Sequence, residues 1–585
     1  MLDRGASAKN WEPRTSKTSA VLSYAILLGG VITIGVAVYM VMVSYSSLPY
    51  EDGWAQIDVV ANGIDLRSFN WFWHQHNEHR FVIPKLFLVV DLLFFHASQV
   101  FLLISILVIQ LLHLTVLAWS MRALGRWRGD LWRTGVGVAA FCLFCPSQWF
   151  NFVLGLQVNF VLLGLFVTLS FVGLLLYWAH SEQQASCPQA WPFLLFSILG
   201  ALGATYSLAN GNLLWPLLVA AAVLLRLRLS AIISLAITGT ISTALYFHHY
   251  VSPTAQANLM TEGPAEFLKF VAVYLGSAWV QAGLRSAGII GIAGAGIACF
   301  LVARSGWYAR TNKAFSLQMV LTLLFCIGTS FLTALGRLNF GVSYAFSPRY
   351  QTFVLIFWCC LGLMLLELAS TVKRMRVPFL VMQVCLLAIM LRGAYLARYP
   401  IREARSHGFQ LNVASMALLA GVPDWEQLSY VGVKLNYLMR EASYLQRDRL
   451  SIYSGDVYSQ LGKPMDSVFR LASPDQCTGA LESTTSIEGA GSQALRITGW
   501  AWDFRNGRPP SEMIATTDGV ITGLGALGDW RPAVRAANPR VTSSYSGYAG
   551  YVRDGKKDTP VKIYAILRGN PRSACYIATI GRPLR

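Results

Sequence analysis

The sequence has few charged residues. Only 13% of its 585 residues are Asp, Glu, Lys or Arg, whereas soluble proteins contain about 25%. Hydrophobic residues make up 55% of the chain and the mean hydropathy is +0.48. Because so little polar surface cannot cover several water-soluble domains, the composition excludes a soluble multidomain enzyme and indicates a chain that lies mostly in lipid.

Cysteines in a metal-binding pattern are also lacking. The Cys-x-x-Cys pair, Cys142 and Cys145, lies in an apolar stretch with no second pair to complete a zinc site. We interpret both as small hydrophobic residues. Cys477 and Cys575 lie in the polar tail, where an oxidising compartment would let them join the two ends of a domain.

The net charge of +18 does not indicate a nucleic-acid partner. The Lys and Arg residues gather in short loops beside apolar segments and in the last third of the chain, where membrane topology accounts for them. Basic residues of the tail 1–20 precede an apolar run, 21–43, that lacks a small-residue cleavage site. We therefore predict a cytoplasmic amino terminus, an uncleaved first span and a first outer loop over 47–99.

Hydropathy and loop charge predict about eleven spans in a transmembrane domain over 21–396. The predicted spans are 21–43, 100–121, 134–147, 152–178, 191–208, 212–225, 229–250, 286–303, 314–335, 350–371 and 377–396. Val82–Ala97 is interpreted as an amphipathic helix at the outer interface. An odd number of crossings places everything after 396 in the periplasm of a bacterial inner membrane. Two interpretations fit Glu266–Val280: a second interfacial helix or a twelfth span. A twelfth span would place the tail on the cytoplasmic side.

The tail changes character twice. Residues 397–472 are polar with helical periodicity, which predicts a helical connector. Residues 473–585 contain short apolar runs bounded by Gly, Pro, Asp and Asn, which predict a β-sandwich. The fold class is thus a polytopic α-helical membrane protein with a C-terminal extracytoplasmic β-sandwich. The aromatic residues that could hold a glycan there, or simply form its core, are Trp500, Trp502, Trp530, Tyr548 and Tyr551.

The first outer loop opens with two adjacent carboxylates, Glu51 and Asp52. Placing such a pair at a lipid boundary costs free energy unless the carboxylates are solvated, paired with cations or part of a functional site. A solvated loop start is the simple interpretation. A general base that accepts a proton from an attacking hydroxyl is the functional one, and Trp54 beside the pair is suited to stacking on a sugar.

The same loop continues with His74, His76, Glu78 and His79. Three imidazoles and a carboxylate raise the possibility of a metal, but their spacing matches no standard site. We interpret them as a polar wall of an active site or a strip that binds substrate, with an ordinary polar surface as the alternative, and assign no metal site. Arg80 follows directly and could hold a phosphate through two parallel hydrogen bonds.

Further polar residues interrupt apolar sequence wherever the topology places the outer face. They are Gln148, Asn151, Gln157, Asn210, Arg337, Arg349 and Tyr350. Each alone is typical of a helix-end turn. Together they converge on one side of the membrane, and the two arginines run against the positive-inside rule, which favours an anionic partner such as a lipid phosphate.

With these features the chain resembles the C-type glycosyltransferases, the polytopic GT-C superfamily. The resemblance rests on the acidic pair after the first span, the long first loop with an interfacial helix, the number of spans and the β-rich tail. The patches Gln148–Asn151, Thr205–Gly211 and Ser347–Tyr350 are similar to bacterial membrane proteins of this kind. The layout, with its carbohydrate-binding-like outer domain, is also similar to that of mycobacterial arabinofuranosyltransferases.

The resemblance implies an inverting transfer of a sugar from a polyprenyl-phosphate donor to a glycan, lipid or protein acceptor. Asp52 or Glu51 would be the base, and Arg80, Arg337 and Arg349 would hold the phosphate. The loop has no Asp-x-Asp sequence, so dependence on Mg²⁺ or Mn²⁺ stays open.

Two other functions fit a polytopic chain. A transporter or flippase of lipid-linked glycans should show internal repeats and midplane helix breaks, which we do not find in the sequence. An oligosaccharide ligase would place its chemistry in a larger, later outer loop, whereas the first outer loop is the longest between spans here.

Overall fold

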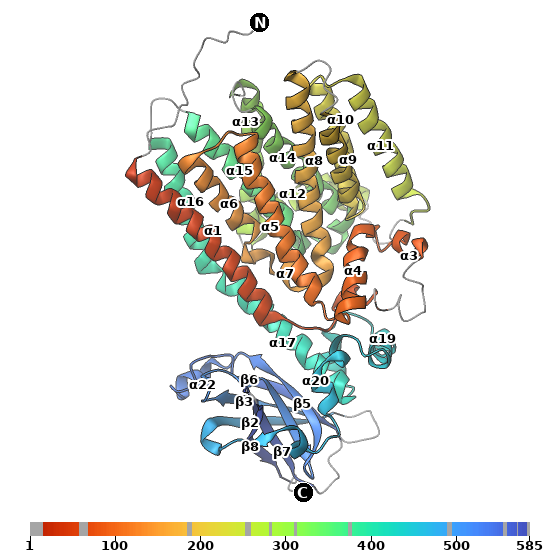
Figure 1. The fold of residues 1–585 in the computed structure, drawn as a ribbon, viewed down its shortest axis with the longest axis vertical. Helices are drawn as coiled ribbons and strands as arrows, with labels where there is room; N and C mark the ends of the chain where they lie inside the picture. Colours follow the sequence, from red (N-terminus) through yellow and green to blue (C-terminus); the bar gives the residue numbers. More distant parts are fainter. Residues whose placement is uncertain are drawn as a thin grey trace.

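The computed structural model describes residues 16–55, 57, 68–183, 190–251, 259–279, 283–308, 313–371, 377–487, 494–553, 559–569 and 571–581. A helical bundle forms one part and a β domain the other, and helix α17 (Arg398–Ala420) runs between them (Figure 1). The β domain lies at the end of the bundle where α1 (Lys17–Ser44) finishes.

Apolar helices make up the bundle. Besides α1 they are α5 (Val100–Ala123), α6 (Gly129–Leu143), α8 (Val158–Gln183), α9 (Trp191–Thr205), α10 (Leu214–Leu224), α11 (Leu229–Phe247), α12 (Leu259–Gly276), α13 (Leu284–Tyr308), α14 (Lys313–Arg337), α15 (Gln351–Thr371) and α16 (Val377–Leu396). Close contacts between small residues hold neighbours together. A Cβ on Gly137 of α6 would lie 2.6 Å from the Ile26 carbonyl oxygen of α1, so these backbones touch directly.

Nine helical segments in the described part of the chain are long and apolar enough to cross a membrane. The predicted spans 191–208 and 212–225 fall instead on the shorter apolar helices α9 and α10. These helices confirm the character of a multi-pass membrane protein, while the count of about eleven crossings stays a prediction. Residues 266–276 of the segment Glu266–Val280 belong to α12, whose Phe270 and Val273 side chains are fully buried within the bundle.

The first loop contains a short turn, η1 (Glu51–Gly53), then α3 (Phe69–Trp73) and α4 (Val82–Phe95). Helix α4 is amphipathic, as predicted, with Leu93 and Phe94 exposed on one side. Its two charged residues point inward. Lys85 donates to the Trp71 carbonyl oxygen at 2.7 Å, and Asp91 accepts the Gln99 amide at 3.0 Å. Burial of both charges leaves an apolar surface that suits a membrane interface.

Helices also occupy the connector. After α17 come α18 (Trp425–Ser429), α19 (Leu435–Arg447) and the single turns α20 (Asp456–Gln460) and α21 (Met465–Val468). The periodic residues Leu428, Val431 and Leu438 are fully buried. Helix α17 touches the end of α1, since a Cβ on Gly408 would lie 2.2 Å from the Ser44 carbonyl oxygen.

The β domain is one curled sheet instead of the predicted two-sheet sandwich. Its strands are β1 (Arg470–Leu471), β2 (Cys477–Ile487), β3 (Ala494–Asp503), β4 (Glu512–Thr517), β5 (Val520–Asp529), β6 (Gly547–Arg553), β7 (Val561–Leu567) and β8 (Ser573–Ile580). They pair in the order β1-β8-β7-β4-β5-β6-β3-β2. The sheet curls until β2 approaches β8, because side chains on its concave side, such as Ile497 and Ile563, enclose their own core.

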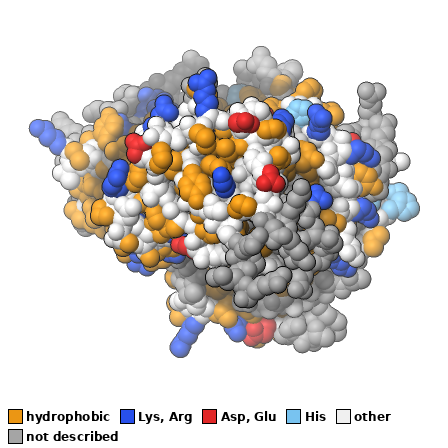
Figure 2. Space-filling view, turned by 90° about the horizontal axis from the view of Figure 1, so that it is seen from below, with side chains coloured by type: hydrophobic (Ala, Val, Ile, Leu, Met, Phe, Trp, Pro, Cys, Tyr) orange, Lys and Arg blue, Asp and Glu red, His pale blue; other side chains and the backbone are white. Residues whose placement is uncertain are grey.

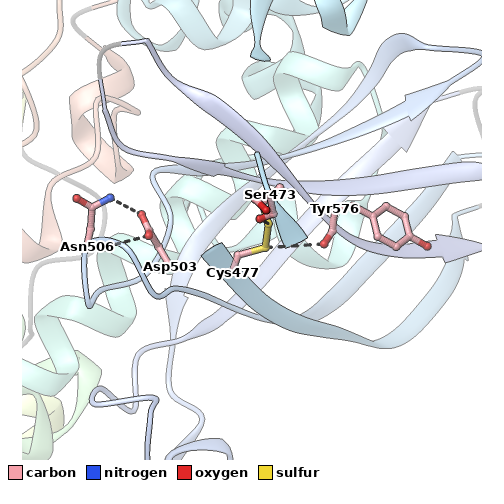
Figure 3. Close-up of a disulfide and its surroundings, with 6 residues drawn as sticks. Ser473, Cys477, Asp503, Asn506 and Tyr576 are labelled. Carbon is pink, nitrogen blue, oxygen red and sulfur yellow. Dashed lines mark hydrogen bonds between the residues drawn. A yellow bond between two sulfur atoms is a disulfide. The ribbon is translucent and has the colours of Figure 1, made fainter. Parts of the chain in front are cut away.

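A disulfide between Cys477 and Cys575 joins β2 to β8 across the opening of this sheet (Figure 3). Their Cα atoms are 6.3 Å apart. Next to it, buried Asp503 accepts hydrogen bonds from the Asn506 backbone amide and side-chain amide. The pairing proposed from the sequence is therefore made, and it closes the curled sheet.

The aromatic residues proposed for glycan binding lie mostly inside. Trp502, Tyr548 and Tyr551 are almost completely buried, and the Tyr551 hydroxyl donates to Asp424 at 2.7 Å. Trp530 is half-buried beneath Arg402 of α17. Seen from the β-domain end, the described surface carries its basic side chains singly among apolar ones (Figure 2).

Replacing both Cys477 and Cys575 by Ser should loosen the β domain without disturbing the bundle. The two residues are separated by 98 positions, and closing a loop of that size contributes about 4 kcal/mol in the chain-entropy model. Limited proteolysis of the purified full chain should therefore cut the variant within residues 473–585 faster than the parent. Equal cutting would show that the bridge is dispensable.

Candidate functional site

The carboxylate of Glu51 forms an ion pair with Arg349 at the end of the bundle nearest the β domain. Its Oε2 atom accepts a hydrogen bond from Arg349 Nη2 at 3.0 Å, across 298 residues of sequence. Arg349 lies in η9 (Pro348–Tyr350), the turn that begins α15. Both side chains are mostly buried, at 35% and 22% exposure, so the pair is only partly screened by water.

Asp52 faces the histidine-rich part of the same loop. Its Oδ1 atom lies 3.7 Å from His76 Nε2. The polar contact with His76 lowers the pKa of Asp52 from its usual value, against the opposing effect of partial burial. Asp52 is 46% exposed, so its carboxylate is ionised at neutral pH and open to a partner.

A second ion pair joins Glu78 to Arg337, the last residue of α14. A tight turn presents Glu78, because the His76 and His79 backbones exchange hydrogen bonds at 2.8 and 2.9 Å. Burial lowers the pKa of His79 to about 4, and its Nδ1 accepts the Ala209 amide at 3.2 Å. His79 is therefore a neutral wall of the site.

The two ion pairs belong to one cluster. Tyr350 hydrogen-bonds Arg337 and also lies within electrostatic range of Arg349. The positive charge of Arg349 also favours the ionised form of Asp52. The first loop, the end of α14 and the start of α15 thus meet in one place.

The connector holds Glu51 from outside. The Glu51 amide donates to the Val431 carbonyl oxygen at 3.0 Å. Glu51 has a φ of 44°, which a non-glycine residue rarely adopts and which is common at functional sites. Gly432, with a φ of 81°, lies so close that an added Cβ would be 2.8 Å from Glu51 Cγ.

Gln148 and Asn151, predicted to bind substrate, instead hold the turn that carries Arg349. Asn151 Nδ2 donates to the Arg349 carbonyl oxygen at 2.9 Å and to Thr352 Oγ1 at 2.8 Å. Thr352 donates to Gln148 Oε1 at 2.8 Å. Gln148 and Asn151 are completely buried, so they position Arg349 and do not contact a ligand from solvent.

The Arg349 guanidinium still has capacity to bind. Its Nε atom is buried and has no hydrogen-bond acceptor among the described residues. Buried donors are nearly always satisfied in folded proteins. The guanidinium also lies 5.2 Å from the ring centre of Phe150. A ligand would meet the exposed part of the guanidinium, and the buried Nε would gain an acceptor only if neighbouring side chains moved.

Arg80, predicted to hold a phosphate, has a different task. It is 3% exposed and donates to the carbonyl oxygens of Trp73, Tyr246 and His248 at 2.6, 2.6 and 2.5 Å. Because each of its three nitrogens donates to a carbonyl oxygen, Arg80 fastens the first loop to the end of α11. We do not include it in the phosphate site.

The other predicted residues surround the cluster unevenly. Trp54 is fully buried, where it cannot stack on a sugar, and its carbonyl oxygen accepts the Tyr437 hydroxyl at 3.1 Å. Gln157 is 8% exposed and Asn210 is half-buried in η5 (Ala209–Leu213). The backbone carbonyl oxygen of His74 accepts a hydrogen bond from Lys85 Nζ at 2.9 Å. Among the described residues, none of these side chains forms a hydrogen bond or an ion pair with Glu51 or Asp52.

Tyr50 and His407 were not anticipated from the sequence. Their rings meet edge to face at 4.6 Å, and His407 Nδ1 shares a hydrogen bond with the Tyr430 hydroxyl at 2.9 Å. Tyr50 hydrogen-bonds Glu51. Gly432 is a residue typical of a turn. No local sequence pattern indicated that this turn and α17 would contact residues 50 and 51.

A small apolar pocket, about 50 Å³ in volume, lies beside the cluster. It opens between η1, α4 and α5 and is lined by Gly53, Trp71, Leu88, Leu92, Leu102 and Leu156. Asp91 and Gln99 are its polar residues. Gly53 directly follows Asp52, so the pocket begins next to the acidic pair.

Within the described ranges no group of three or more His, Cys, Asp or Glu side chains could hold a metal ion. The chain matches no family model, no curated protein and no solved structure. The site must therefore be interpreted from its own chemistry.

Replacing Gly432 by Ala should displace Glu51. The new methyl group would meet Glu51 Cγ, which forces the loop to move and weakens the bond from the Glu51 amide to Val431. Hydrogen exchange of the peptide that contains Glu51 should accelerate.

Gly462→Ala is the matched control, because Gly462 has a similar φ of 80° but open space around its Cβ position. If hydrogen exchange of the peptide containing Glu51 is accelerated equally in both variants, backbone strain explains the acceleration. The contact between Gly432 and Glu51 would then not be its cause.

Proposed function

We propose that the chain is an inverting glycosyltransferase that moves a sugar from a polyprenyl-phosphate donor to a glycan, lipid or protein acceptor. The reaction would take place at the outer face of a bacterial cytoplasmic membrane, where lipid-linked donors replace nucleotide sugars. One observation carries the proposal. Two carboxylates of the first loop, Glu51 and Glu78, form ion pairs with Arg349 and Arg337 from later helices at one end of the bundle.

Arg349 and Arg337 are suited to the phosphate of the donor. Guanidinium groups hold phosphate oxygens through parallel, charge-assisted hydrogen bonds, which strengthen in a partly buried site. Arg349 has a buried Nε without an acceptor in the described chain, and Arg337 stands close to the same Tyr350. Together they would stabilise the negative charge that develops on the leaving phosphate.

Asp52 is suited to be the general base. It is ionised, half-exposed and kept in that state by His76. The acceptor hydroxyl oxygen would form a bond to the anomeric carbon while the bond from that carbon to the phosphate oxygen breaks. The bonding electrons would leave with polyprenyl phosphate, and the hydroxyl proton would pass to Asp52. Attack opposite the leaving group inverts the anomeric centre.

Glu51 has a supporting role in this mechanism. Its carboxylate positions Arg349 before the donor arrives, and Tyr50 and Val431 fix its place. The small apolar pocket that begins at Gly53 could contact the hydrocarbon chain of the donor next to its phosphate, since Asp91 and Gln99 are the only polar residues among the described ones that line it.

Asp52→Asn should abolish the envelope glycan made by this chain. Loss of a general base lowers the rate by about 10²–10⁴. Glu51→Gln should cause a smaller loss, because it removes a positioning contact. Glycans from cells with matched expression would be compared by mass spectrometry.

Asp448→Asn serves as the control, since Asp448 pairs only with the adjacent Arg447 on the exposed connector surface in the described structure. If deletion of the whole chain removes a glycan but Asp52→Asn and Glu51→Gln leave it unchanged, sugar transfer through this base is wrong, and transport of a finished glycan becomes the better account.

A further inference from the structure

The segment Trp530–Tyr545 of the β domain has a short helix, α22 (Pro532–Ala537), in which no residue is buried. Its sequence, Pro-Ala-Val-Arg-Ala-Ala, is mostly apolar. A helix of this composition gains little from facing open water. Figure 1 shows α22 on the side of the β domain below α1 and α16.

Two stacking contacts fix this segment on α17. Arg402 lies over the Trp530 ring at 4.5 Å, and Arg405 lies over the Tyr545 ring at 3.5 Å. Arg405 also hydrogen-bonds Tyr39 of α1. Tyr39 lies within the apolar run 21–43, five positions before α1 ends at Ser44, an interval of about 8 Å along a helix.

With the hydrocarbon boundary placed at the end of α1, the segment lies at the level of the lipid headgroups. Arg402 is one turn, about 6 Å, beyond the start of α17, and a headgroup layer is about 5–7 Å thick on each side of the hydrocarbon. Tyr395 and Tyr399, at the boundary of α16 and α17, are exposed and hold Arg398 between them. Exposed tyrosines and arginines of this kind mark a membrane–water interface.

The same area is basic. Arg398, Arg402, Arg535 and Arg540 are exposed, and none of them forms an ion pair with a described residue. Arg531 is the exception, because Glu482 and Asp529 both pair with it. These four exposed guanidinium groups have no carboxylate partner among the described residues.

We propose that α22 and the start of α17 form a surface that binds the anionic headgroups of the membrane that the bundle crosses. Ala533, Val534 and Ala536 would rest on the interface, while Arg402, Arg535 and Arg540 contact lipid phosphates. This contact would hold the β domain at a fixed height over the site at Glu51. It does not depend on the activity proposed above.

The test uses hydrogen exchange of the full chain in lipid nanodiscs. The discs contain either phosphatidylcholine alone or phosphatidylcholine with about 30% phosphatidylglycerol, an anionic lipid. Amides of residues 531–541 should exchange more slowly in the anionic discs, by about fivefold for each arginine that meets a headgroup. Arg535→Glu together with Arg540→Glu should remove that difference.

Lys463→Glu together with Lys562→Glu is the matched control, because both lysines are exposed at the opposite end of the sheet and the change in charge is the same. This control should keep the slow exchange. Equal exchange of the parent chain in the two kinds of disc would overturn the proposal. Protection that follows the number of chains per disc instead of the lipid charge would also overturn it, since a second copy would then cover α22.

Discussion

The ion pair between Glu51 and Arg349 is the constraint on which the arrangement of this molecule depends. A charge at the edge of a bilayer is costly unless it is paired or solvated, so residues 51 and 349 must meet although 298 positions separate them. The end of α1 and the start of α15 are thereby brought to one point. Asn151 and Gln148 support the pair from within the bundle, and Val431 and Gly432 support it from the connector.

The connector is part of the site and more than a link to the β domain. Helix α17 touches the end of α1 at Gly408 and brings His407 against Tyr50, one residue before the acidic pair. The β domain packs on the same helix, with Trp530 under Arg402. Just after the helix, Asp424 accepts a hydrogen bond from the Tyr551 hydroxyl. A shift of the β domain would therefore be felt at Glu51 through packed side chains, without a flexible hinge between them.

Hydropathy and charge were enough to predict a bundle of membrane helices, a helix near Val82 and a β-rich tail, because these follow from local composition. The roles of single polar residues were not predictable. Arg80 and Arg349 look alike in sequence, yet Arg80 is surrounded by three carbonyl oxygens and Arg349 faces a carboxylate. Strand patterning likewise predicted β structure but not the strand order that brings β2 beside β8 when the single sheet curls.

The most direct measurement is the affinity of the purified chain for polyprenyl phosphate, the product that would leave the site. If Glu51 and a lipid phosphate share Arg349, Glu51→Gln should tighten binding because the guanidinium is released, whereas Arg349→Gln should weaken it about tenfold, or 1.4 kcal/mol. Opposite signs would support the account. Equal affinities in the parent chain and both variants, or a loss of the same size in both variants, would show that the pair only holds the fold together and does not receive a phosphate.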